Sequence, residues 1–159
     1  MKLSTTILAA SVLAAGSAFA EPVAPGDVQF DEYGAVATSL TGQAGDPAKG
    51  AEVLSKRSLG NCVACHQISA LPDVPFQGNI GPMLDGVGDR WNEAELRGIV
   101  SNAKNTYPGT MMPAYYKVDD FVRPGNAFTG KAAEGALDPL LTAQQIEDVV
   151  AFLVTLKDQ

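Results

Sequence analysis

The chain is poor in metal-binding side chains. Among its 159 residues it has two cysteines and one histidine, and all three lie between Cys62 and His66. A structural zinc site usually takes four ligands, most of them Cys or His, so the sequence excludes one here. Ligation of a metal by two histidines of this chain is excluded for the same reason.

Basic residues and long hydrophobic runs are also scarce. Lysine and arginine number 11 against 18 acidic residues, which gives a formal net charge of −7. Proteins that bind nucleic acids carry a basic patch or stripe, so a nucleic-acid partner is not expected. A membrane-spanning helix needs about 20 apolar residues. No stretch after the N-terminal segment approaches this length, so we expect no membrane span.

The N-terminal segment has the pattern of a cleaved signal peptide, residues 1–20. Lys2 precedes a run of apolar and small residues that ends in Ala18-Phe19-Ala20, an A-x-A cleavage signal. Its most apolar part, Ile7 to Ala15, is too short for a membrane anchor. Cleavage would leave residues 21–159, with 10 basic against 18 acidic residues and a net charge of −8. The pattern predicts export to the periplasm of one domain's length of chain.

The pentapeptide Cys62-Val63-Ala64-Cys65-His66 is a C-x-x-C-H motif, the attachment signature of a c-type haem. The Cys62 and Cys65 thiols would add to the haem vinyl groups as thioethers, because two intervening residues let the chain make one turn along the porphyrin edge. His66 would then be the proximal ligand of the haem iron. We therefore predict one covalently attached haem c, a cofactor that is assembled outside the bacterial cytoplasm.

Two other interpretations of the cysteine pair fit less well. A thioredoxin-like redox pair, and with it a thiol-disulfide oxidoreductase, requires a strand before the motif. Leu59-Gly60-Asn61 is not an apolar strand. A plain disulfide between Cys62 and Cys65 would leave His66 unexplained.

The second axial ligand is expected to be a methionine, since no other histidine exists. The candidates after the signal peptide are Met83, Met111 and Met112. Met83 follows His66 too closely to reach the opposite haem face easily. We choose Met112, because Pro113 fixes the backbone beside it, with Met111 as the alternative. An iron with His and Met ligands has no position open to substrate, so it transfers electrons.

Three helices are predicted. Asp46 and Pro47 form an N-cap and first helical position for a helix over 47–58. Capping boxes, in which a polar N-cap is followed three residues later by Glu or Gln, open the other two helices at Asn92 and Thr142. The last helix has a broad apolar face, formed by Ile146, Val149, Val150, Leu153, Val154 and Leu156.

The remaining segments are predicted to be irregular. Residues 21–46 should form an extension, and 71–88 a loop rich in proline and glycine. Residues 114–139 show neither a helical nor a strand period, and a connection of this length usually serves binding or covers a site. Four aromatic residues are expected to anchor it to the body: Tyr115, Tyr116, Phe121 and Phe128.

The chain resembles the class I cytochromes c. The carriers of this resemblance are Gly81-Pro82-Met83-Leu84, the stretch Met112 to Tyr115 and the last helix. The resemblance implies that the Pro82 carbonyl accepts a hydrogen bond from His66 and that Arg90 binds a haem propionate. It also implies an all-α cytochrome c domain over 47–159, with three main helices around the covalent haem, a long irregular N-terminal extension over 21–46 and a long loop before the C-terminal helix.

Four segments more specifically resemble the SoxX family, the monohaem cytochrome subunits of SoxAX complexes of periplasmic thiosulfate oxidation. They are Gly60 to His66, Gly86 to Trp91, Gly109 to Tyr116 and Arg123 to Gly125. The resemblance implies a heterodimer with a SoxA-like haem subunit that carries the catalytic cysteine. It also implies a SoxYZ-like carrier protein and a soluble cytochrome as electron acceptor. The alternative is a free-standing, diffusible cytochrome c.

Overall fold

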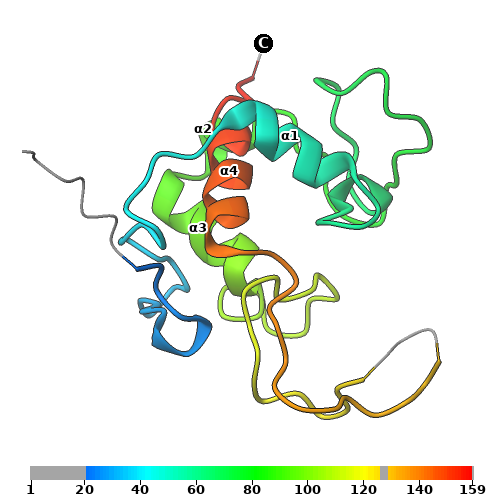
Figure 1. Cartoon of the computed structure of the whole chain (residues 1–159). Helices are drawn as coiled ribbons and strands as arrows, with labels where there is room; N and C mark the ends of the chain where they lie inside the picture. Colours follow the sequence, from blue (N-terminus) through cyan, green and yellow to red (C-terminus); the bar gives the residue numbers. More distant parts are fainter. Residues whose placement is uncertain (1–20, 126–128, 159) are drawn as a thin grey trace, which may run out of the picture.

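The computed structural model of the chain describes residues 21–125 and 129–158 (Figure 1). The predicted signal peptide and Phe128 lie outside these residues. Within them no helix is long and apolar enough to cross a membrane. The helical segments are η1 (Pro25–Asp27), α1 (Pro47–Ser55), η2 (Cys62–Ala64), α2 (Val87–Arg90), α3 (Glu93–Asn102) and α4 (Ala143–Leu153).

Helix α1 begins where the sequence predicts and ends three residues early. The Asp46 side chain accepts hydrogen bonds from two backbone N–H groups of the first turn, which confirms the predicted cap. The helix ends at Ser55 and not at Ser58. Its last turn is closed by a bend of the following chain, in which the Gly60 N–H donates to the Val53 carbonyl at 3.1 Å. This bend leads directly into the C-x-x-C-H motif.

Helices α3 and α4 both begin with the predicted capping boxes. The Glu95 N–H donates to the Asn92 side chain at 3.0 Å, and the Asn92 N–H donates to the Glu95 carboxylate at 2.7 Å. Thr142 and Gln145 make the same reciprocal pair at 3.2 and 2.9 Å. Each box satisfies two N–H groups that an uncapped helix would leave without a partner.

The core lies where α1 and α3 pack against α4 (Figure 1). Gly50 lets α1 cross α4 closely, because a Cβ atom there would collide with the Asp148 carbonyl and lie 2.8 Å from the Phe152 Cβ. The predicted apolar face of the last helix is buried apart from Val154, which is half-buried. Helix α4 ends at Leu153, so Val154 and Leu156 follow the helix and are not part of it. The most deeply buried large side chains are Leu40, Leu54, Ile68, Leu96, Leu141 and Ile146.

The N-terminal extension is irregular, as predicted, but it is held tightly to α3 and α4. The Arg97 guanidinium donates to the Val36 carbonyl at 2.9 Å, and the Leu40 N–H donates to the Glu147 carboxylate at 2.7 Å. Arg97 and Glu147 form a buried ion pair with each other, at 2.9 Å from Nε to Oε1. A buried charge is costly unless it is paired and hydrogen-bonded, and the extension supplies part of that pairing.

The segment predicted as a loop over 71–88 differs from the prediction at its end. Helix α2 begins inside it, at Val87, after Gly86 with a left-handed backbone at φ 70°. The Gly88 N–H donates to the Leu156 carbonyl at 2.9 Å. This contact with the C-terminal segment, which is distant in sequence, stabilises a turn that the local sequence does not indicate.

The described residues of the long connection before α4 form an arm, defined here as residues 117–125 and 129–140, that projects from the helices (Figure 1). An antiparallel bridge between Gly125 and Ala132 joins its two limbs. The predicted anchors Tyr115 and Tyr116 are buried at its base. The prediction for Phe121 is wrong, because this ring is 43 % exposed. It lies instead under the Lys117 ammonium, 5.2 Å from the ring centroid.

Candidate haem-binding site

The C-x-x-C-H motif forms one tight turn, as its spacing predicts. Asn61 enters the turn with a left-handed backbone at φ 49°, and η2 follows. The N–H groups of Cys65 and His66 both donate to the Cys62 carbonyl, at 3.0 and 2.9 Å. The two cysteines are half-buried and form no disulfide with each other. The turn therefore carries two thiols and an imidazole within five residues, and residues 21–61 before it contain no strand.

The His66 ring is oriented by the loop that follows the motif. Its Nδ1 lies 2.7 Å from the Pro82 carbonyl oxygen. A carbonyl can only accept, so Nδ1 carries the proton and Nε2 keeps its lone pair free for a metal. Gly81 makes this approach possible, because a Cβ atom there would lie 2.7 Å from Nδ1 and 2.8 Å from Nε2 of the ring.

Backbone hydrogen bonds hold the loop over residues 78–82, here called the proximal loop, against the motif. The Gly78 N–H donates to the Val63 carbonyl at 2.7 Å, and the Gly81 N–H donates to the Cys65 carbonyl at 2.8 Å. Both donors are glycines, and a Cβ atom at either would collide with the motif, so the close approach of the loop depends on these two residues. The loop and the motif thus form one structural unit.

Arg90 supports the same proximal loop from outside. Its guanidinium donates to the Asp85 carbonyl at 2.8 Å and to the Met83 carbonyl at 3.3 Å. These bonds use one N–H group each of Nη1 and Nη2 and place the arginine beside the segment that carries Pro82. The binding of a haem propionate by Arg90 stays a prediction.

The three methionines lie in different surroundings. Met83 and Met111 are 47 % and 77 % exposed, whereas Met112 is half-buried and packed against the hydrophobic core. The Met112 backbone is held on both sides: its carbonyl accepts from the Lys104 ammonium at 2.7 Å, and its N–H donates to the Thr110 hydroxyl at 3.3 Å. No pattern in the sequence indicates the contact with Lys104.

Tyr115 links the Met112 loop to the cysteine motif. Its hydroxyl donates to the Gly60 carbonyl at 2.9 Å, and the side chain is 7 % exposed. Burial, together with the neighbouring Cys62, raises the pKa of the Tyr115 hydroxyl, so it remains a donor throughout the neutral range. Burial also raises the pKa of the Cys62 thiol to about 11. The sequence predicts Tyr115 as an anchor but does not predict its hydrogen bond with the Gly60 carbonyl.

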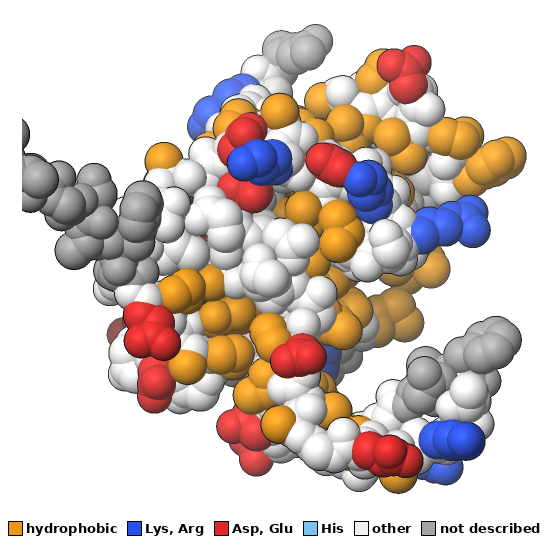
Figure 2. Space-filling model, in the orientation of Figure 1, with side chains coloured by type: hydrophobic (Ala, Val, Ile, Leu, Met, Phe, Trp, Pro, Cys, Tyr) orange, Lys and Arg blue, Asp and Glu red, His pale blue; other side chains and the backbone are white. Residues whose placement is uncertain are grey.

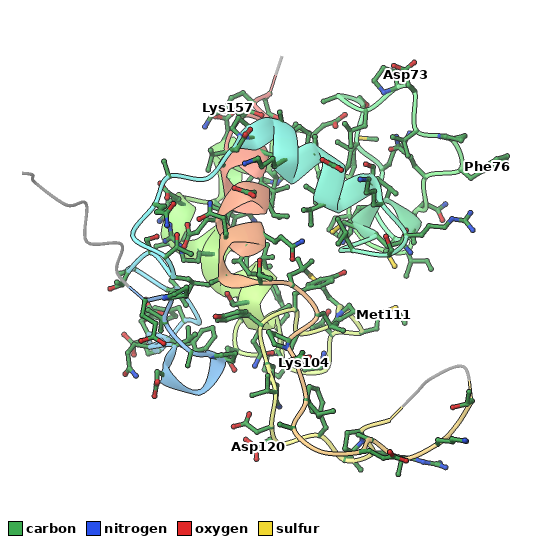
Figure 3. The ribbon with its side chains drawn as sticks, viewed as in Figure 1. Asp73, Phe76, Lys104, Met111, Asp120 and Lys157 are labelled. Carbon is green, nitrogen blue, oxygen red and sulfur yellow. The ribbon has the colours of Figure 1, made fainter. Side chains whose placement is uncertain are left out.

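The residues present fit a covalently attached haem. The donor set comprises two thiols on one turn, an imidazole with Nε2 free and a thioether held on a separate loop. Figure 2 shows hydrophobic side chains along the side of the molecule that carries this motif and this loop, and Figure 3 shows Met111 projecting outward from its loop. Among the described residues, no group of three or more Cys, His, Asp or Glu side chains is arranged to hold a metal ion directly.

Comparison with known proteins agrees with this site. Residues 47–157 match the Cytochrome c family. The chain belongs to the cytochrome c family. A curated member, cytochrome c-550 of Bacillus subtilis (strain 168), is 37 % identical to this cytochrome over 60 residues, which is 38 % of this chain and 44 % of that protein. The chain thus matches less than half the length of that curated relative.

A solved structure matches this cytochrome over much more of its length. A chain of the crystal structure of SoxXA from P. pantotrophus is 64 % identical, with a TM-score of 0.82, and the match covers 86 % of this chain and 99 % of that one. The predicted resemblance to SoxX and the class I cytochrome c fold are confirmed. The cofactor is haem c, and Cys62 and Cys65 provide the C-x-x-C pair.

Proposed function

We propose that the chain is the electron-accepting subunit of a SoxAX-type complex in the periplasm. There, thiosulfate would be oxidatively coupled to a cysteine of a SoxYZ-like carrier, and the electrons would pass through this chain to a soluble cytochrome. The observation that carries the proposal is the 64 % identity with a chain of SoxXA over 99 % of that chain. Export through the signal peptide at residues 1–20 belongs to the same proposal.

The residues of the site have distinct roles in this proposal. Haem c supplies a one-electron carrier. Cys62 and Cys65 tether it, and His66 ligates the iron through Nε2 while the Pro82 carbonyl holds the other ring nitrogen. Met112 is the second axial ligand. Met112 is half-buried, and its backbone N–H and carbonyl are both hydrogen-bonded. These features support Met112 over Met111, which is 77 % exposed.

The chemistry on sulfur belongs to a partner. Both cysteines of this chain are used as thioethers, so no thiolate remains to react with thiosulfate or to accept its sulfur. With His66 and Met112 as its two protein ligands, the iron would have no position open to a substrate either. A SoxA-like haem subunit with its own catalytic cysteine supplies what this chain lacks.

The arm supports a stable partner over a diffusible carrier. None of its described residues between Asp119 and Leu140 is buried. It exposes Val122 fully, Leu140 to 60 % and Phe121 to 43 %. Apolar side chains grouped on a projecting segment are typical of surfaces that a partner covers. Figure 2 shows the arm standing away from the body with both acidic and basic side chains along it.

Co-purification and thiosulfate-dependent reduction test the proposed function together. The chain, extracted from periplasm, should bring down a larger haem protein. Its own haem should be reduced by thiosulfate only when that protein and the carrier are present. Reduction of the isolated chain by thiosulfate, or the absence of any haem-containing partner, would favour the free-standing cytochrome.

Removal of the arm should separate partner binding from haem binding. The Leu141 N–H donates to the Tyr115 carbonyl at 3.0 Å, so the two ends of the arm are close and a short Gly-Ser linker can replace residues 119–139. We expect an unchanged haem spectrum and a partner affinity weakened about 100-fold, or about 2.7 kcal/mol. Val122→Asp should also weaken the affinity for the partner and leave the haem spectrum unchanged. An armless chain that binds the partner with full affinity would exclude the arm from the interface.

A further inference from the structure

The hydroxyl of Tyr115 makes a contact that the cytochrome function alone does not explain. It joins two segments that lie 55 residues apart in the chain. One end of the bond is the Gly60 carbonyl, two residues before the first haem-binding cysteine. The other end is three residues after Met112. The bond therefore connects the segment that tethers the haem to the loop that supplies the proposed second axial ligand.

The chain between Met112 and Tyr115 has little freedom to move. Pro113 restricts the backbone at its own position, and Ala114 is 8 % exposed. Beyond it, the Tyr115 carbonyl accepts from the Leu141 N–H at 3.0 Å and the Tyr116 N–H donates to the Ser101 carbonyl at 3.0 Å. Met112 cannot move far from its place unless this short stretch turns about Tyr115.

We propose that Tyr115 is a positioning residue that keeps Met112 on the haem iron by fixing the Met112 loop to the cysteine turn. The proposal rests on the proposed function, because it takes Met112 as the axial ligand. An exogenous ligand reaches ferric iron only when Met112 has left it. Its apparent affinity therefore equals its intrinsic affinity multiplied by the fraction of molecules in which the loop is open. Loss of the Tyr115 hydroxyl should increase that fraction.

Tyr116 provides a matched control on the adjacent residue. The two side chains are 7 % and 6 % exposed, and both hydroxyls donate to a backbone carbonyl. The Tyr116 hydroxyl donates to Val23 at 2.7 Å, in the N-terminal extension and away from the cysteine motif. Tyr115→Phe and Tyr116→Phe thus each remove one hydroxyl and leave one carbonyl without its donor, in a buried hydrogen bond for Tyr115 and a partly buried one for Tyr116.

The experiment measures imidazole binding to the ferric, haem-loaded protein. We expect Tyr115→Phe to bind imidazole about tenfold more tightly than the wild type, since each factor of ten corresponds to about 1.4 kcal/mol in the opening equilibrium. The imidazole affinity of Tyr116→Phe should stay within about twofold of that of the wild type. Its melting temperature should nevertheless fall, as that of Tyr115→Phe does. Equal imidazole affinities for the two variants would overturn the proposal, because a merely structural role would affect both alike.

A second measurement on the wild type applies if Tyr115→Phe fails to mature with haem. Saturating imidazole takes the iron position of Met112, which should release the Tyr115 hydroxyl and make this ring reactive to nitration by tetranitromethane. Tyr33, 73 % exposed, should react with and without imidazole, and Tyr116 in neither case. Tyr115 that stays unreactive in imidazole would overturn the proposal. Failure of the proposed axial ligand is recognised separately, by a Met112→Ala variant that keeps the methionine-iron absorption band.

Discussion

Replacement of Met112 by Ala should open the haem iron to exogenous ligands. The ferric variant should lose the weak absorption band of methionine-ligated iron and bind imidazole on the order of 100-fold more tightly, equivalent to about 2.7 kcal/mol. Its reduction potential should fall, because thioether sulfur favours ferrous iron. The spectrum, an imidazole titration and a potentiometric titration measure these three effects.

Met111 is the natural control for this variant, since it is the neighbouring residue and has the same side chain. At 77 % exposed it makes few contacts, so Met111→Ala should keep the band, the imidazole affinity and the melting temperature of the wild type. If the band disappears in Met111→Ala and persists in Met112→Ala, the axial ligand is Met111. Persistence in both would exclude either methionine.

Replacement of Arg97 by Met should destabilise the protein by about 3–5 kcal/mol, the cost of leaving a buried charge without its partner. Arg97 and Glu147 are each 3 % exposed. The arginine also donates to Glu93 at 2.7 Å and to the Val36 carbonyl at 2.9 Å, so its loss disturbs α3, α4 and the N-terminal extension together. Urea unfolding followed by circular dichroism measures the free-energy difference.

A surface ion pair provides the control for Arg97. Lys49 and Asp46 lie 3.9 Å apart, with side chains 68 % and 46 % exposed. Lys49→Met should change the free energy of unfolding by less than about 0.5 kcal/mol. The double variant Arg97→Met, Glu147→Leu should recover only part of the lost stability. It leaves no unpaired buried charge, but the Leu40 N–H and the Val36 carbonyl lose their partners. A loss for Arg97→Met as small as that for Lys49→Met would mean that Glu147 is satisfied without the guanidinium.

The features predicted from the sequence are those set by residues close together in the chain. The capping boxes at Asn92 and Thr142 need partners only three residues away, and the turn of the C-x-x-C-H motif lies within five residues. Periodicity identified the buried face of α4. The end of α1 was wrong by three residues, because the bend at Gly60 depends on contacts made after the helix has ended.

The features that sequence reasoning missed depend on pairs distant in the chain. Arg97 and Glu147 each resemble an ordinary surface residue of an amphipathic helix, and their burial follows only from the packing of the N-terminal extension over both helices. The hydrogen-bond partners of Tyr115 and Lys104 can likewise be identified only from the folded structure of the loop that carries Met112. The contact of Pro82 with His66 was expected solely from the family resemblance.

The most direct test of the account is the intact mass and pyridine haemochrome spectrum of the protein purified from periplasm. We expect a red protein with the mass of residues 21–159 plus one haem, a spectrum of two-thioether haem c and no titratable thiol. A colourless protein with two titratable thiols would contradict the haem assignment and everything built on it.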